Sequence, residues 1–400
     1  MSWFGIEGHD EIVRRFQRAI AQGRIASTFL FLGPAGIGKR MLAERLAMTF
    51  QCEKNDPRLM EPCGKCFSCR QALAHEHPDI IFVSKPEDKA FIPIDFFIGP
   101  KEARHQMGLC TELAKKPVYQ KRKIAIIDDA DYLNIEGANS MLKTLEEPPR
   151  NSIIILIGTS AARQLPTIRS RCQIVRFSPL KTELVEQILR QKREDELRMA
   201  AEISAMLTEK KKGKISGTQK LSAASILPEE LIPKIAANSG GSIQEALALS
   251  NESFWIFRTE FLKKLSQGIY ERQTIYASLE EQINSAGKVP ALRRARLRVI
   301  LETAADFFRR LAFHLSKAVP ADENFAEEWL PILEDAKTTW PFNAEGAADM
   351  ALRTADYLEL VQRNVYQPLI LDSWLDELIR VFGGESAPFQ IAPWALNPNP

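Results

Sequence analysis

One segment, GPAGIGKR at residues 33–40, constrains the fold more than any other part of the sequence. It follows the apolar run TFLFL at 28–32 and precedes a helical pattern. A strand, a glycine-rich turn and a helix in this order are typical of a phosphate-binding loop, in which backbone N–H groups and the helix dipole face an anion. The positions expected to face a nucleotide phosphate are Gly33, Gly36, Gly38 and Lys39. The sequence thus predicts an α/β phosphate-loop domain.

The last position of this loop departs from the usual pattern. Ser or Thr normally follows the lysine, because its hydroxyl binds magnesium, whereas this chain has Arg40, which cannot ligate a cation. Further along, KIAIIDD at 123–129 places Asp128 and Asp129 at a strand end, where an ATPase holds its metal and activates water. Asp129 is one methylene shorter than the usual Glu, and taken alone both acids also suit a solvated strand end. We therefore expect at most weak binding of ATP or ADP and poor hydrolysis.

The first 180 residues alternate short apolar runs with amphipathic stretches, which predicts a parallel sheet covered by helices on both faces. The expected strands are residues 28–32, 80–83, 124–127, 153–157 and 174–177. These runs are almost wholly apolar, as expected for strands buried on both faces. A helix is expected over 135–147 and ends at Pro148, whose ring cannot continue it.

Four of the six cysteines lie within 18 residues and predict a metal site. The candidate ligands are Cys52, Cys63, Cys66 and Cys69. Four thiolates close a tetrahedral site and leave no open position for chemistry, so the expected cofactor is one structural zinc ion. Four unrelated buried cysteines are the alternative, but the residues between them are too polar for a core.

Bulk composition excludes several classes of protein. With 45% hydrophobic and 26% charged residues, the chain falls in the range of ordinary globular domains. A net charge of +2 is too small to indicate direct nucleic-acid binding, which needs clustered Lys and Arg. No apolar run approaches the roughly 18 to 20 residues of a membrane span. We expect a cytoplasmic protein without a membrane partner, whose role on DNA, if any, is local or indirect.

Beyond residue 180 the pattern is helical, and a polar, basic stretch at 209–220 reads as a loop. The expected domains are 1–180, the phosphate-loop domain with the zinc module at 52–69; 181–252, a small helical domain; 253–385, an all-α domain; and 386–400, a loose tail. Long helices are expected over 290–317 and 347–381. Length alone supports two or three domains.

Longer stretches resemble the clamp-loader branch of the AAA+ ATPases, which acts with bacterial DNA polymerase III. The resemblance is carried by GRIASTFLFLGPAGIGKR at 23–40, the four-cysteine insert, HPDI at 77–80, IIDDADYLNIEGANSMLKTLEEPPRNSIIILIGTS at 126–160, LPTIRSRCQIVRFSPL at 165–180 and SGGSIQEALAL at 239–249. NVYQPLILDSWLDEL at 364–378 is similar, more weakly, to the last helices of the family's collar. The resemblance implies an AAA+ domain followed by a helical lid and an oligomerising collar.

Within that family, three departures distinguish this chain from the active ATPase subunits. It has Arg40, Asp129 and Gln244 where those subunits carry Thr, Glu and Arg. The resemblance therefore implies a stator-like subunit of the DNA polymerase III holoenzyme that helps to load the sliding clamp. Arg171 in Ser-Arg-Cys would be catalytic in trans, as an arginine finger for a neighbouring ATPase subunit, and Thr159 resembles the residue that senses the nucleotide.

The implied partners are the gamma/tau and delta subunits and, through the assembled complex, the sliding clamp and primer-template DNA. An active ATPase of the gamma/tau type is the alternative. A small-molecule kinase is disfavoured because no second substrate motif accompanies the phosphate loop. Lys143, in the same signature, is either structural or faces DNA.

Overall fold

The computed structural model describes residues 3–86, 88–119, 121–209, 227–250, 252–268, 271–287, 290–317, 329–363 and 365–384. The chain divides into two compact units, Met1–Leu247 and Ala248–Pro400. The expected tail at 386–400, and all but the first residue of the expected loop at 209–220, lie outside the described residues. None of the helices in the described ranges is long and apolar enough to cross a membrane.

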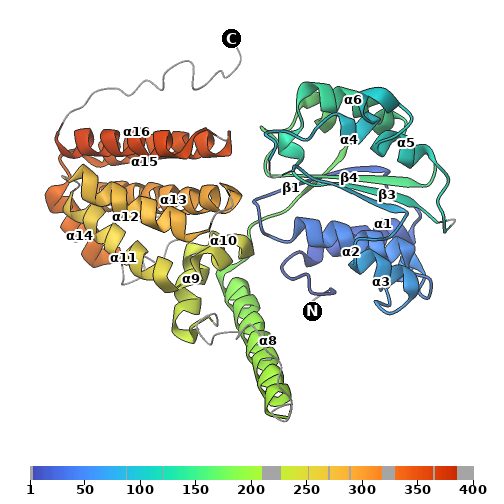
Figure 1. Cartoon of the computed structure of the whole chain (residues 1–400), viewed down its shortest axis with the longest axis horizontal. Coiled ribbons are helices and arrows are strands. Elements are labelled where there is room, and N and C mark those ends of the chain that lie inside the picture. Colours follow the sequence, from blue (N-terminus) through green and yellow to red (C-terminus); the bar gives the residue numbers. More distant parts are fainter. Residues whose placement is uncertain are drawn as a thin grey trace. The chain divides into compact units, whose positions relative to one another are not determined.

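A five-stranded parallel sheet forms the centre of the first unit (Figure 1). Its strands are β1 (Thr28–Leu32), β2 (Ile80–Val83), β3 (Lys123–Ile127), β4 (Ser152–Gly158) and β5 (Gln173–Arg176), in the spatial order β2-β3-β4-β1-β5. In the register of the central strands, Ile155 of β4 lies between Phe29 of β1 and Ile126 of β3. The predicted parallel sheet is therefore confirmed, with strand ends within one residue of those expected.

The sheet is covered by a layer of helices on each face (Figure 1). One layer contains α1 (Asp10–Ala21), α2 (Lys39–Gln51), η1 (Pro57–Leu59) and α3 (Phe67–Leu73); the other contains α4 (Asp95–Ile98), η2 (Lys101–Ala103), α5 (Leu109–Ala114) and α6 (Ile135–Glu146). Alternate residues of β1 enter the two layers, because successive side chains of a strand point to opposite faces. Phe29 and Phe31 join the core beneath α2, and Leu30 and Leu32 join the core beneath α6.

The edge strand β5 differs from the prediction. We expected all five strands to be buried on both faces, but three of the four residues of β5 are exposed, and the side chain of Ile174 is 37% accessible. β5 pairs only with β1, so its outer edge has no neighbouring strand among the described residues. An apolar sequence run therefore did not imply burial here.

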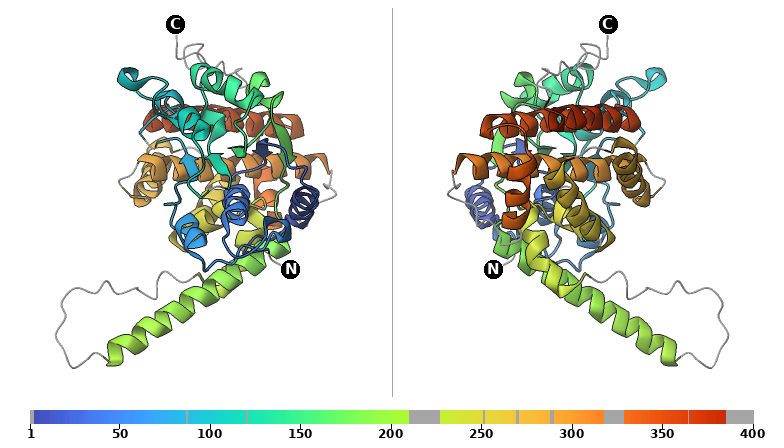
Figure 2. Two further views of the ribbon diagram at one scale, coloured as in Figure 1. Left: turned by 90° about the vertical axis from the view of Figure 1, so that its right-hand side faces the viewer. Right: turned by 90° about the vertical axis from the view of Figure 1, so that its left-hand side faces the viewer.

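The first unit continues beyond the sheet as helices that return to the phosphate loop. After η3 (Ala130–Tyr132) and α7 (Pro166–Arg169), which flank β4, the later elements are α8 (Thr182–Glu209), η5 (Glu229–Leu231), α9 (Ile232–Asn238) and α10 (Ile243–Leu249). Figure 2 shows α8 as one unbroken helix. Two backbone hydrogen bonds fix the return: Leu180 N–H donates to Gly241 at 3.1 Å, and Ile243 N–H donates to Gly36 at 3.0 Å.

Helices are the regular elements of the second unit in its described residues. Its elements are α11 (Glu252–Gln267), α12 (Arg272–Ser285), α13 (Pro290–Ser316), α14 (Trp329–Thr339), α15 (Ala344–Gln362) and α16 (Gln367–Phe382). The single helix expected over 347–381 is wrong, because two helices occupy this range. Pro368 lies in the first turn of α16, where its missing N–H is tolerated, and it could not have continued a helix through this point.

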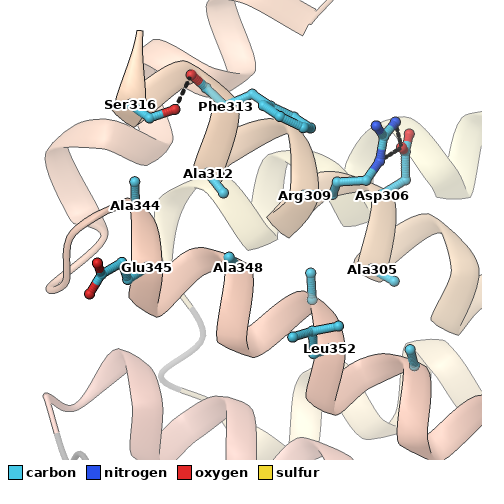
Figure 3. Close-up of a pocket in the computed structure, with 12 residues that line it drawn as sticks. Ala305, Asp306, Arg309, Ala312, Phe313, Ser316, Ala344, Glu345, Ala348 and Leu352 are labelled. Carbon is cyan, nitrogen blue, oxygen red and sulfur yellow. Dashed lines mark hydrogen bonds and ion pairs between the residues drawn. The ribbon is translucent and has the colours of Figure 1, made fainter. Parts of the chain in front are cut away.

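Aromatic side chains fill the core of the second unit, where Phe261, Phe307, Phe308 and Trp374 are fully buried. A cavity of about 680 Å³ opens between α13 and α15 (Figure 3). Its walls are mainly alanine side chains, together with Phe313 and Leu352. This apolar surface is accessible on the second unit.

Candidate functional site

The phosphate loop connects β1 to α2 and depends on glycine at three positions. Gly36 and Gly38 have φ angles of +72° and +98°, in the left-handed region that side chains rarely adopt. Gly33 approaches the backbone of Phe177 so closely that an added Cβ would lie 2.5 Å from its carbonyl oxygen. The sequence motif therefore has the tight local geometry that a phosphate loop requires.

Lys39 is the first residue of α2, and its side chain turns back into the loop. Its Nζ donates a hydrogen bond of 2.6 Å to the carbonyl of Gly33 and another to the carbonyl of Pro34. The residue is only 6% exposed, and burial lowers the pKa of its ammonium group, against the opposite effect of Asp128 and Asp131. The carbonyl groups of Gly33 and Pro34 therefore hold the ammonium group of Lys39 within the loop.

Arg40, the residue that replaces the expected hydroxyl, reaches the acidic strand end. Its Nε donates to Glu44 at 2.8 Å, and its Nη1 lies 3.5 Å from Oδ2 of Asp128. The hydrogen bond to Glu44 has the largest effect on the pKa of Arg40 and raises it. The charges of Glu44, Asp128 and Asp129 also raise this pKa. A fixed positive charge thus lies against the carboxylate expected to hold magnesium.

Asp129 adopts an unusual backbone conformation at the end of β3. Its φ is +56°, and its N–H donates to the side chain of Asp128 at 3.0 Å. Burial, followed by the charge of Asp128, raises the pKa of Asp129. The two carboxylates expected at this strand end are therefore adjacent to each other, and one of them faces Arg40.

Thr159 lies at the end of β4, next to an acid that sequence reasoning missed. Its hydroxyl donates to Oδ2 of Asp131 at 2.6 Å, and its N–H donates to both carboxylate oxygens at 2.9 and 3.0 Å. Gln164 donates to the same carboxylate. The third carboxylate of the run DDAD was the available signal, since it returns to the sheet edge through the short turn η3. Asp131 therefore fixes Thr159 in position.

The start of α10 closes over the phosphate loop. A Cβ added to Gly36 would lie 2.5 Å from Oγ of Ser242 and would also clash with Gln244. Gln244 is the residue found where active subunits of the resembled family carry arginine, and here it packs against the loop backbone. The predicted residues of the loop, of the strand end and of the Gly-Gly-Ser segment are thus brought together.

His9 forms a second contact that the sequence did not predict, with the phosphate loop. Its Nε2 lies 2.7 Å from the carbonyl oxygen of Ile37, and its ring packs edge-on against Phe177 with 5.0 Å between ring centroids. Burial lowers the pKa of His9. The imidazole therefore attaches the start of α1 to the phosphate loop.

The four clustered cysteines meet at the opposite end of α2. Their sulfur atoms all lie within 4.8 Å of one another, and none forms a disulfide. Sulfur atoms of a tetrahedral zinc site, each about 2.3 Å from the metal, lie roughly 3.8 Å apart. The cluster is therefore compact enough for a metal ion such as zinc.

Backbone N–H groups surround these sulfurs and favour their ionised form. Cys63 N–H lies 3.3 Å from the sulfur of Cys52, and Cys69 N–H lies 3.3 Å from that of Cys66. The N–H of Lys65, more than that of Cys66, lowers the pKa of the Cys63 thiol to about 6. Burial raises the pKa of Cys69, so a cation is needed to hold all four as thiolates. The donor set fits a tetrahedral metal ion.

A buried polar network attaches the cysteine cluster to the sheet. Ser68 donates to the carbonyl of Gln51 at 2.7 Å, and its Oγ lies 2.8 Å from Nε2 of His77. Asp79 N–H donates to Nδ1 of His77 at 3.0 Å, which leaves the other ring nitrogen to donate to Ser68. All three side chains are almost completely buried. The HPDI motif therefore supports the cysteine cluster.

Arg171 lies in the loop between α7 and β5. Its side chain is 29% exposed and forms an ion pair with Glu146 at the end of α6, with Nε 2.6 Å from the carboxylate. In the free chain this side chain contacts its own domain, and its role in trans stays a prediction. Arg169, the nearby comparison, is exposed and donates to the carbonyl of Ala161.

Comparison with known proteins concerns mainly the first unit. Residues 8–181 match the family model described as DNA polymerase III, delta subunit. Over 147 residues, 37% of this chain, the sequence is 35% identical to DNA polymerase III subunit delta′ of Pseudomonas aeruginosa, of which it covers 42%. Over 178 residues, 44% of this chain, it is 33% identical to subunit delta′ of Bacillus subtilis, of which it covers 50%.

A further relative is subunit tau of Bacillus subtilis, 29% identical over 180 residues, 45% of this chain and 30% of that protein. Among solved structures, a gamma subunit-related protein of DNA polymerase III from Thermotoga maritima covers 92% of this chain and 99% of its own, with 16% identity and a TM-score of 0.36. The chain spans about half the length, or less, of the curated relatives that it matches. Residues 8–181 of this chain are therefore similar to the DNA polymerase III delta-subunit family, and the curated relatives are named delta′ and tau.

Proposed function

We propose that this chain is a delta′-type subunit of a bacterial clamp loader. In this role it assembles with ATPase subunits of the gamma/tau type and with a delta subunit, and helps the complex to place the sliding clamp on primer-template DNA in the cytoplasm. The observation that carries the proposal is the Arg40–Asp128 contact within an otherwise complete phosphate loop. Such a contact is expected in a subunit that retains the phosphate-loop fold but hydrolyses ATP poorly. It is not expected in an active ATPase subunit.

Chemistry at the loop supports weak hydrolysis by this chain. A magnesium ion bound by Asp128 would have to displace the guanidinium of Arg40 or lie beside it, and like charges at this separation repel strongly. The residues that would contact ATP or ADP are Gly33, Gly36, Gly38, Lys39 and Arg40, with Asp128, Asp129 and Thr159 at the adjoining strand ends. Binding without hydrolysis is compatible with the proposal.

In the proposed complex, Arg171 acts on the ATP of a neighbouring subunit. A guanidinium next to the γ-phosphate stabilises the negative charge that develops on the oxygens during transfer, an effect of about 10³ to 10⁵ in rate when it is supplied in trans. The partial exposure of Arg171 on the surface of the first unit supports this role, because a buried arginine could not reach a partner.

The proposal also covers the cysteine cluster and the helical parts of the chain. We infer that Cys52, Cys63, Cys66 and Cys69 hold one structural zinc ion, and that residues 181–252 and 253–385 form the lid and collar of an AAA+ subunit. The apolar cavity between α13 and α15 supports an oligomerising role for the collar, since exposed apolar surface commonly marks an interaction site.

Reconstitution with gamma/tau and delta subunits tests the role of Arg171. Arg171→Ala should leave assembly unchanged, because a partly exposed ion pair contributes little to stability. DNA-stimulated ATP hydrolysis and clamp loading by the complex should fall substantially, and Lys should restore little, since it lacks the two-pronged geometry of a guanidinium. Arg169→Ala is the matched control. Unchanged hydrolysis and loading with Arg171→Ala would contradict the trans role.

An active ATPase of the gamma/tau type is the second candidate, favoured by the retained Lys39 and Asp128. Steady-state hydrolysis by the isolated chain separates the two functions. The delta′-type function predicts a rate near background, whereas turnover that Lys39→Ala abolishes would identify a motor subunit.

A further inference from the structure

Glu146 is the contact that determines where the guanidinium of Arg171 lies. Nε of Arg171 donates to Oε1 of Glu146 at 2.6 Å, and Nη2 contacts the same oxygen. Nη1 donates to the carbonyl of Thr167 at 3.0 Å and to Oγ of Ser170 at 3.2 Å. All three nitrogens of the guanidinium therefore have partners within their own chain.

The backbones on both sides of this contact are held by independent hydrogen bonds. Arg171 N–H donates to Ile168 at 3.1 Å, and its carbonyl accepts a hydrogen bond of 2.8 Å from Thr28 at the start of β1. Glu146 is the last residue of α6, whose preceding residue Leu145 is buried in the core. The two side chains can therefore separate by rotation alone, without movement of either element.

The carboxylate occupies the part of the guanidinium that a phosphate would use. Carboxylate and phosphate oxygens both bind through pairs of guanidinium N–H groups, so the two anions compete for the same edge. Glu146 and Arg171 are 48% and 29% exposed, and an ion pair this accessible to water is weak. A phosphate group, which carries more charge than a carboxylate, can thus replace Glu146 at small cost.

We propose that Glu146 is a positioning residue that holds Arg171 against its own domain until a nucleotide phosphate of the neighbouring subunit displaces it. The inference rests on the proposed function of Arg171 in trans. In the free subunit the charge of Arg171 is then paired with that of Glu146. The guanidinium is released when the nucleotide phosphate replaces the carboxylate as its partner. Glu146 does not touch the reacting atoms.

The isolated chain provides a test that is independent of any partner. Phenylglyoxal modifies accessible guanidinium groups, and peptide mass spectrometry measures its rate at each arginine. Glu146→Ala should increase the rate at Arg171 about two- to fivefold relative to Arg169 in the same sample, as expected for loss of one weak ion pair. Arg169 also reports any general unfolding.

Glu147→Ala is the matched control, because Glu147 is adjacent and exposed and its side chain has no hydrogen bond or ion pair to any described residue. It should leave the rate at Arg171 unchanged. Equal modification rates at Arg171 in the Glu146→Ala variant and the unmodified chain would overturn the inference. This holds regardless of the hydrolysis rates of the reconstituted loader.

The reconstituted loader tests the consequence of the contact. Glu146→Ala should raise ATP hydrolysis without DNA about two- to fivefold and leave the DNA-stimulated rate within about twofold, since an engaged finger has already left Glu146. A fall in both rates would mean that Glu146 supports the engaged arginine, and would overturn the inference. If Arg171→Ala leaves hydrolysis unchanged, the proposed trans function fails, while the modification rates still decide whether Glu146 holds Arg171.

Discussion

The guanidinium of Arg40 lies 3.5 Å from Oδ2 of Asp128, although 88 positions separate the two residues in the sequence. Arg40 lies in the first turn of α2, and Asp128 directly follows the strand β3, so the parallel sheet brings them together. The contact places a positive side chain against the carboxylate that was predicted to hold magnesium.

Replacement of Arg40 should therefore restore an effect of magnesium on nucleotide binding. Arg40→Thr supplies a hydroxyl and removes the competing charge, and we expect affinity for ADP in the presence of Mg²⁺ to rise about tenfold. Isothermal titration with and without Mg²⁺ measures this change. Arg15→Thr, which alters an exposed arginine of α1, should have no effect. A magnesium dependence equal to that of the unmodified chain would contradict the interpretation of Arg40.

The cysteine cluster should contain one metal ion per chain when the protein is prepared without chelators. Cys66→Ser removes one of four ligands, and the zinc content should fall close to zero because a structural site requires all four. Metal analysis measures the content, and hydrogen exchange should show loss of protection in α3 but not in α16. Cys110→Ser, at a cysteine outside the cluster, is the control. Protein with no zinc before mutation would refute the prediction.

Gly36 and Gly38 should differ in how well they tolerate alanine. Both have positive φ, so alanine strains the backbone at either position. Only at Gly36 does the new Cβ also collide with Ser242 and Gln244, whereas at Gly38 the nearest atom, in His9, is 4.0 Å away. We expect Gly36→Ala to lower the free energy of unfolding by about 1 to 3 kcal/mol more than Gly38→Ala. Urea unfolding measures the difference, and equal losses would show that α10 does not close on the loop.

Acid should destabilise the first unit through its buried imidazoles. Burial lowers the pKa of His9 and of His77, so in each case the unfolded chain takes up protons at a higher pH than the folded chain. Their contribution is fully present above the ordinary pKa of about 6.5 and is lost as the pH falls below it. His9→Gln keeps an N–H donor but cannot titrate in this range. The free energy of unfolding should then decline less steeply between pH 6.5 and 5, and an identical slope would exclude His9 as a contributor.

Local patterns predicted the first unit well, because its signals are short in range. The strands β1 and β2 begin and end where the apolar runs do, and α6 ends just before Pro148. The sequence also identified the four cysteines, since their spacing itself encodes the cluster. By contrast, the exposure of β5 depends on its place at the sheet edge, which no local pattern contains.

Contacts between distant segments were the part that could not be predicted. Asp131 binds Thr159 across 28 positions, and His9 reaches the carbonyl of Ile37 across another 28. Glu146 and Arg171 are separated by 25 positions and meet only because α6 and the loop before β5 lie at the same edge. Each partner was visible as a polar residue, but its pairing depends on the completed sheet. The break between α15 and α16 was missed because the apolar pattern continues through it, despite Pro368.

Helix α2 connects the phosphate loop of the first unit to its cysteine cluster. The phosphate loop ends at Lys39, the first residue of α2. Cys52, the first residue of the cysteine cluster, directly follows Gln51, the last residue of α2. Thirteen residues of α-helix span about 20 Å, and Leu42 and Leu46 fix this length against the sheet. Since a helix resists stretching and bending over so few turns, the distance between the anion-binding turn and the thiolates is constant. If a nucleotide tilted the start of α2, Cys52 at the other end of the helix would therefore move with it.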